Sequence, residues 1–195
     1  MDVRRTLTRC TAPAVLVLVG SAACDGRATA PLSVDNAHAA ATADAHAKAA
    51  HGPEISRWLA GLRAATAPFH DIVTADDAGW NTQLTACMDL PGTGAMGEHF
   101  GNPGLIDGTP EALLPELLVY EPQKNGRRRL VAVEYIVPFD LWTAAEPPSL
   151  HGVDFHRNEG FGLWVLHAWV WKHNPAGMFA DWNPTVTCAY APTAG

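Results

Sequence analysis

The sequence predicts one α+β domain in which N-terminal helices pack on an antiparallel sheet. Apolar residues recur at helical spacing within residues 53–78, strand-like runs separated by turns follow from residue 81, and the two patterns do not alternate. The chain has 195 residues, of which 48% are apolar and 17% are charged. This is enough for one packed core and too little for two domains of ordinary size.

Residues 1–24 have the pattern of an export signal. Three arginines precede the apolar segment 12–20, which is too short to span a bilayer permanently. Small residues then lead to Cys24, which resembles the lipid-bearing cysteine of bacterial lipoproteins, although Ser21 stands where those signals usually carry leucine. Two outcomes remain open: lipid attachment at Cys24, or ordinary cleavage after Ala23. Both predict a protein of the periplasm or cell envelope, in contact with the membrane through an N-terminal lipid at most.

Residues 25–52 are rich in alanine, carry scattered polar residues and lack an apolar stripe. We therefore expect a flexible tether there, followed by a single folded domain over residues 53–195. Removing the three arginines and one aspartate of the signal leaves 10 Lys and Arg against 19 Asp and Glu, a net charge of −9. An acidic surface repels nucleic acid and anionic lipid head groups, which argues against both as partners.

The folded domain is expected to begin with two helices. Pro53 and Glu54 suit the first turn of a helix, and apolar residues then recur at helical spacing as far as Leu62. Pro68 should break or kink this run. A second helical stretch is predicted over residues 69–78.

From residue 81 onward the sequence has the pattern of strands and turns. The clearest hairpin has Asn125-Gly126 in its turn, where glycine provides the positive φ that tight hairpins need. The expected elements, in order, are strands at 83–88, 95–100, 117–121 and 130–137, a long loop at 138–158, a strand at 163–171, a turn-rich segment at 174–184 and an edge strand at 185–189.

The cysteines predict a disulfide. Cys10 leaves with the signal and Cys24 would carry lipid, so Cys87 and Cys188 remain as one pair. An even number of remaining cysteines in an oxidising compartment favours a disulfide between them. The alternative, in which both thiolates bind a metal, is better suited to a reducing compartment.

Glu134 is the most informative single position, because it lies within the otherwise apolar run 130–137. On a strand it would share a face with Leu130, Ala132 and Ile136. A buried carboxylate has to be protonated, paired, hydrogen-bonded or bound to a metal. Either a structural ion pair or a functional site would therefore explain it.

Two histidines complete a candidate site with this carboxylate. His167 is a polar residue in the middle of the apolar run 164–171, and His99 follows two glycines that let the backbone approach a site closely. Together His99, Glu134 and His167 form a set of two imidazoles and one carboxylate, which suits zinc, iron or copper. Met96 is a further candidate ligand whose soft thioether would favour copper.

The remaining histidines have alternative interpretations. His151 and His156 lie in the expected long loop, with Asp154 between them, so this loop either closes over the site, with His156 as an added ligand, or is simply solvated. His70 and His173 are expected to be structural.

Four short motifs resemble a group of exported bacterial proteins of unknown function. They are Met96-Gly97-x-His99, Pro115-Glu116-x-Leu118-x-Tyr120-Glu121-Pro122, Leu130-Val131-x-Val133-Glu134-Tyr135 and Leu166-His167-x-Trp169-x-Trp171-x-x-Asn174-Pro175-x-Gly177-x-Phe179. The resemblance covers residues 68–188. It implies no activity, so it supports the domain boundaries and the choice of residues alone.

The sequence contains no glycine-rich phosphate loop, nucleophile elbow, His-Glu-x-x-His helix or Cys-x-x-Cys pair. The leading hypothesis is a periplasmic or cell-envelope protein that binds a transition metal without catalysis, its partner being a metal ion or a small molecule. One alternative is a small hydrolase-type enzyme, with Glu134 as general base and His167 as its acid partner. The other is a structural or ligand-binding module whose polar residues hold loops in place.

Overall fold

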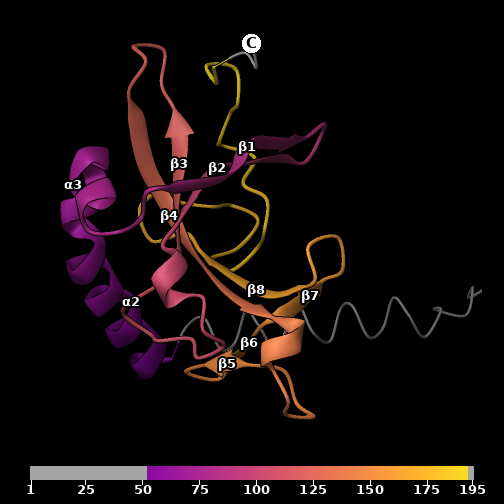
Figure 1. Cartoon of the computed structure of the whole chain (residues 1–195). Helices are drawn as coiled ribbons and strands as arrows, with labels where there is room; N and C mark the ends of the chain where they lie inside the picture. Colours follow the sequence, from indigo (N-terminus) through magenta and orange to yellow (C-terminus); the bar gives the residue numbers. More distant parts are fainter. Residues whose placement is uncertain (1–51, 193–195) are drawn as a thin grey trace, which may run out of the picture. The chain divides into compact units, whose positions relative to one another are not determined.

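The computed structural model describes residues 52–192, which form an α+β fold around a six-stranded antiparallel sheet (Figure 1). The predicted α+β class is confirmed. The predicted export signal, Cys24 and the tether as far as residue 51 lie outside the described residues. No helix within residues 52–192 is long and apolar enough to cross a membrane.

Two helices precede the sheet, as the sequence predicts. Helix α2 (Pro53–Thr66) has proline in its first turn and buries its apolar stripe, while Pro68 lies in the 3-10 turn η1 (Ala67–His70). Helix α3 (Ile72–Asp77) follows. Proline cannot donate the backbone hydrogen bond that would continue α2, and this is the physical reason for the break.

The strands of the main sheet lie in the order β1-β2-β3-β4-β8-β7, and every neighbouring pair is antiparallel. They are β1 (Thr82–Leu90), β2 (Gly94–Gly101), β3 (Leu117–Pro122), β4 (Arg128–Pro138), β7 (His156–Asn158) and β8 (Leu163–Ala168). A separate small hairpin joins β5 (Ser149–Leu150) to β6 (Val153–Asp154), and two short 3-10 turns are η2 (Pro103–Leu105) and η3 (Phe139–Leu141). The predicted hairpin between β3 and β4 is present, and Gly126 in its turn has φ +76°.

Three expected segments differ from the prediction. The loop expected over 138–158 contains η3, the β5–β6 hairpin and strand β7. The strand expected over 163–171 ends at Ala168, because the next amide, that of Trp169, donates to the carbonyl of Met178 in the closing segment. The prediction of an edge strand over residues 185–189 is wrong.

The segment 185–189 is irregular because side chains satisfy its backbone. The Thr185 amide donates to Asn183 Oδ1, and the Thr187 amide donates to Glu121 Oε1. These amides therefore have partners without a neighbouring strand.

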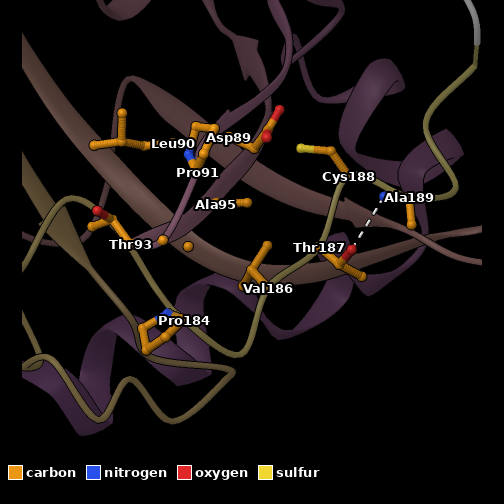
Figure 2. A pocket seen from close by; sticks show the side chains of 12 residues that line it. Asp89, Leu90, Pro91, Thr93, Ala95, Pro184, Val186, Thr187, Cys188 and Ala189 are labelled. Atoms are coloured by element: carbon orange, nitrogen blue, oxygen red, sulfur yellow. Dashed lines mark hydrogen bonds between the residues drawn. The ribbon is translucent and has the colours of Figure 1, made fainter.

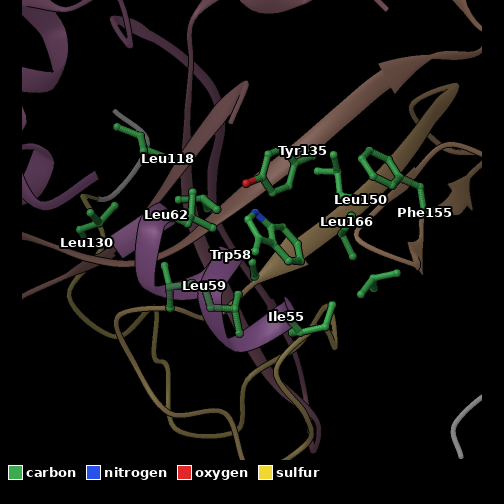
Figure 3. Packing of buried hydrophobic residues seen from close by; sticks show 14 of the residues in the cluster. Ile55, Trp58, Leu59, Leu62, Leu118, Leu130, Tyr135, Leu150, Phe155 and Leu166 are labelled. Carbon is green, nitrogen blue, oxygen red and sulfur yellow. The ribbon is translucent and has the colours of Figure 1, made fainter. Parts of the chain in front are cut away.

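The main hydrophobic core lies between α2 and one face of the sheet (Figure 3). Trp58 of α2 packs against Tyr135 of β4, with ring centroids 6.1 Å apart, and stacks on Phe179 at 5.8 Å. The indole Nε1 of Trp58 and the hydroxyl of Tyr135 both donate to the carbonyl of Ala112, each at 2.7 Å. Apolar burial and satisfied polar groups together fix the helix on this face.

A β-bulge in β4 changes which residues face this core. Val119 pairs with Ala132 and Tyr120 pairs with Leu130, so Val131 is an extra residue in β4. The bulge shifts the alternation of side chains by one position, which places Leu130 in the main core. The expectation that Leu130 shares a face with Glu134 is therefore wrong.

Candidate metal centre

Glu134 and His167 occupy directly paired positions on the neighbouring strands β4 and β8. Residues directly opposite one another in an antiparallel pair point to the same face of the sheet. On this face Glu134 also lies beside Leu117 of β3. The face is the one opposite α2, since the alternate residues of β4, Val133 and Tyr135, belong to the main core.

His99 reaches the same point from β2, two strands away from β4. It pairs with Val119, which pairs in turn with Ala132. The sheet curls, so a long side chain of β2 can approach β4 (Figure 1). His99 Nε2 lies 3.4 Å from Glu134 Oε2 and 3.5 Å from His167 Nε2.

The structure thus brings the three residues of the predicted set together. Each is buried, and one ligand atom from each lies within 4.8 Å of the others. Metal–nitrogen and metal–oxygen bonds of about 2.0–2.1 Å in a tetrahedral site place ligand atoms roughly 3.3–3.4 Å apart. The two distances from His99 Nε2 match this spacing closely.

The second nitrogen of each imidazole faces a polar side chain outside the group. His99 Nδ1 lies 2.7 Å from Thr85 Oγ1 on β1. His167 Nδ1 lies 3.3 Å from Asp181 Oδ1, and neither of these two buried atoms has a hydrogen-bond partner within the described residues. Histidines that bind metals commonly use one nitrogen for the metal and hold the other with a carboxylate or another acceptor. His99 has this arrangement. His167 presents Nε2 to His99, while its Nδ1 lies near Asp181 and also 3.6 Å from Glu134 Oε1.

Asp181 was not predicted from the sequence. It lies in the closing segment after β8, and its second oxygen is 3.0 Å from His156 Nε2. His156, the further candidate ligand, thus contacts Asp181 and is not one of the three grouped residues. Met96 is buried and lines the same cavity as the three. The sequence marks Asp181 only as an acidic residue next to the aromatic residues of segment 179–182.

The other histidines lie away from the group. His151 Nδ1 is 3.1 Å from Glu54 Oε1, and its ring lies 5.2 Å from that of Trp58. The loop that carries His151 therefore packs against α2. His70 packs edge-on against Trp171 at 4.3 Å, in agreement with a structural role.

Burial and mutual proximity set the protonation of the group. Burial, together with the neighbouring His167, lowers the pKa of His99 to about 3, so this imidazole is neutral near pH 7. Burial raises the pKa of Glu134. Burial alone would lower the pKa of His167, but the carboxylates of Glu134 and Asp181 outweigh it and raise that pKa. A neutral His99 is the form that can donate a lone pair to a metal.

Asp181 stays a carboxylate beside this group. Burial alone would raise its pKa, but the imidazoles of His156 and His167 outweigh burial and lower the pKa below the usual range of aspartate. Its Oδ1 can therefore accept a hydrogen bond from His167 when Nδ1 of that ring carries a proton.

The three grouped side chains open onto a cavity of about 260 Å³. A second hollow, of about 590 Å³, lies between the tip of the β1–β2 hairpin and the C-terminal segment (Figure 2). Among the described residues that line the second hollow, Asp89 is the one carboxylate and no histidine occurs. The smaller cavity is therefore the one whose lining contains the three grouped residues, although the other is larger.

A disulfide holds β1 beside the site. Cys87 and Cys188 are bridged, with Cα atoms 5.6 Å apart, so the predicted disulfide is confirmed and neither sulfur is a thiolate ligand. The bridged strand β1 also carries Thr85, which contacts His99, and Met88, which lines the cavity. An intramolecular disulfide points to an oxidising compartment outside the cytoplasm.

The function of this site rests on the geometry and chemistry of His99, Glu134 and His167. No protein-family model matches the chain, and no curated protein or solved structure shows significant similarity to it.

Proposed function

We propose that this domain binds a transition-metal ion in the periplasm or cell envelope through His99, Glu134 and His167. The observation that carries the proposal is the convergence of the three side chains, with His99 Nε2 at 3.4 Å from the carboxylate and 3.5 Å from the second imidazole. Thr85 and Asp181 lie against the outer nitrogens. This supports a site with its ligands held in place before the metal arrives.

The donor set narrows the class of metal. Two imidazole nitrogens and one carboxylate suit zinc, iron or copper, whereas magnesium and calcium prefer oxygen ligands alone. Three protein ligands leave at least one coordination position open. Met96, which lines the cavity, would add a soft ligand and favour copper.

Two distances favour metal binding over a hydrolase-type acid–base pair. Glu134 Oε1 lies 3.6 Å from His167 Nδ1, beyond hydrogen-bonding reach, and His99 adds a third ligand atom at 3.4 Å from the same carboxylate. A catalytic pair would need neither the third residue nor its support from Thr85. Metal binding accounts for both.

The test is metal analysis of protein purified without a histidine tag, followed by calorimetric titration with Zn²⁺, Cu²⁺ and Fe²⁺ in turn. The wild type is expected to bind one ion per chain. His99→Ala, Glu134→Ala and His167→Ala should each weaken binding by more than the roughly 10–100-fold that loss of an outer contact costs. The matched control is His173→Ala, which removes an exposed imidazole outside the group.

Two results would contradict the proposal. One is a wild type that binds none of the three ions. The other is full binding by all three alanine variants. Large losses of stability in the variants, without any bound metal in the wild type, would instead favour a structural role for the polar group.

We further propose that the chain is exported and anchored through lipid on Cys24, with residues 25–52 as its tether. The small residues before Cys24 support this, and the disulfide supports an oxidising compartment. Cells grown with a labelled fatty acid should incorporate the label into the wild type. Cys24→Ser should abolish incorporation, and label retained in this variant would exclude the anchor.

A further inference from the structure

The cavity beside the three grouped residues has a polar floor and apolar walls. Leu117, Ile136 and Val165 form a buried apolar cluster, and all three line the cavity next to Glu134 and His167. Small-molecule sites have this composition: predominantly apolar walls with a few polar groups that orient the ligand.

The mouth of the cavity is also apolar. Leu84 of β1 and Phe161, in the turn between β7 and β8, both line it, and they are 45% and 59% exposed. Single exposed apolar residues are ordinary, but two at the entrance of one cavity form an apolar path from solvent to the site.

The volume limits the size of the ligand. At a packing density of about 0.74, a cavity of about 260 Å³ accommodates roughly 190 Å³ of molecular volume. A dry apolar cavity of about 150 Å³ is known to hold benzene. The present cavity is less than twice that size and must also hold the metal ion, so a body of one ring, or a branched chain of equal size, with a small head group suits it.

The open coordination position sets the head group. Glu134 would be the one carboxylate of the protein bound to the ion, and two imidazoles and one carboxylate leave at least one position free. Zinc accepts carboxylate oxygens at about 2.0–2.2 Å, so a ligand with a carboxylate head suits this position. Asp181 also lines the cavity, but its two oxygens face His156 and His167, so it does not occupy the position.

We propose that this cavity binds a small monocarboxylate the size of benzoate, with its carboxylate on the metal and its apolar body against Leu117, Ile136 and Val165. The inference rests on the proposed metal-binding function. It extends that function by assigning a substrate or ligand class to the cavity.

The experiment uses the untagged protein, loaded first with zinc and then titrated with benzoate. Benzoate is expected to bind the zinc-loaded protein one to one and at least tenfold more tightly than the metal-free protein. Acetate has the carboxylate without the aromatic ring, and benzyl alcohol has the ring without the charged carboxylate. Each should therefore bind at least tenfold more weakly than benzoate. In cobalt-loaded protein, benzoate should change the visible absorption spectrum, because the carboxylate enters the coordination sphere.

A variant that fills the cavity separates its role from that of the metal. Leu163→Trp adds volume at a half-buried lining position and should weaken benzoate binding at least tenfold without changing zinc affinity. The matched control is Leu141→Trp, at a 46% exposed position of η3 outside the cavity lining, which should change neither affinity. Should Leu163→Trp lose zinc as well, terphenylcarboxylate serves as the test instead: its three rings and head group exceed the volume of the cavity, so it should bind at least tenfold more weakly than benzoate.

The outcomes distinguish the two proposals. Zinc binding with benzoate no tighter than acetate, or equal benzoate affinity in Leu163→Trp and the wild type, overturns the ligand assignment and leaves the metal site intact. Absence of zinc, copper and iron binding refutes the metal site, and the ligand assignment with it.

Discussion

His99 and His167 direct their Nε2 atoms toward one another at 3.5 Å, although 68 residues separate them in the chain. The two rings are nearly perpendicular, at 83°. A hydrogen bond between them needs a proton on one Nε2 atom, whereas metal binding needs lone pairs on both. An ion between the two nitrogens would turn this contact into the centre of a site.

Zinc should stabilise the folded domain. A ligand that binds the folded state alone raises the free energy of unfolding by about 2.7 kcal/mol at a free concentration of a hundred times its Kd. Thermal unfolding followed by circular dichroism, in zinc and in a chelator, measures the shift. Glu134→Ala should show no shift, and magnesium should produce none in the wild type because it prefers oxygen ligands. An equal shift in Glu134→Ala would place the zinc elsewhere.

Asp181→Ala should weaken zinc binding by about 10–100-fold, the usual cost of losing a contact behind a metal-bound histidine. The reason is that Asp181 Oδ1 faces His167 Nδ1 and orients the ring. Calorimetric titration measures the change, and Asp154→Ala, at an exposed position of β6, is the control. An unchanged zinc affinity in Asp181→Ala would mean that the ring is held without this carboxylate.

The two central residues of the site could be predicted because each interrupts an apolar strand. Glu134 and His167 had to be explained by pairing or by function, since burial of lone polar groups is costly. That they lie directly opposite one another depends on strand order and register, which pattern alone does not specify. His99 was predicted as a ligand from its neighbouring glycines. Nothing in the sequence indicated that its side chain approaches β4.

The unpredicted features depend on tertiary structure. Val131 forms the bulge in β4, yet its side chain is as apolar as those around it, so no local signal marks the change of face. Asp181 and Thr85 contact the histidines only because the closing segment and β1 return to the same face. The edge strand expected at 185–189 failed for a similar reason, since Glu121, 66 residues earlier, satisfies one of its amides.

Replacing both bridged cysteines, in Cys87→Ala/Cys188→Ala, should lower the free energy of unfolding by about 3–5 kcal/mol. The bridge closes a loop of sequence separation 101, and in the chain-entropy model a loop of about 100 residues contributes about 4.7 kcal/mol. Urea denaturation without reductant compares the two proteins. Wild-type protein unfolded in the presence of reductant should match the double variant. A loss below about 1 kcal/mol would show that the unfolded chain is not constrained by the bridge.

Lys172→Met should destabilise the domain by about 3 kcal/mol, because it leaves the buried Glu121 carboxylate without its cation. Lys172 Nζ lies 2.7 and 2.8 Å from the two oxygens of Glu121. The double variant Glu121→Gln/Lys172→Met should recover much of the loss, since it removes the charge that has lost its partner. Chemical denaturation measures both, with Lys124→Met in the exposed hairpin turn as control. Equal losses in the single and double variants would mean that packing, not charge, is responsible.

Glu116→Gln should stabilise the domain at high pH and have little effect at low pH. Glu116 is buried, with Oε2 accepting from the amide of Ile136 at 3.2 Å, and burial raises its pKa to about 8. The unfolded chain loses this proton near its ordinary pKa of about 4.3, whereas the folded protein keeps it to about pH 8. The stabilisation that protonated Glu116 contributes is therefore complete below its pKa in the unfolded chain. It falls as the pH rises to its pKa in the folded protein.

Glutamine keeps the acceptor for Ile136 and carries no titrating proton, so it removes this pH dependence. The difference in free energy of unfolding between Glu116→Gln and the wild type should grow from near zero below about pH 4 to its maximum above pH 8. Urea denaturation at several pH values measures it, and the other titrating groups cancel in the difference because they are common to both proteins. Glu146→Gln, at an exposed position, should show no such trend. A difference independent of pH would mean that Glu116 is already ionised in the folded protein, with its charge compensated by groups nearby.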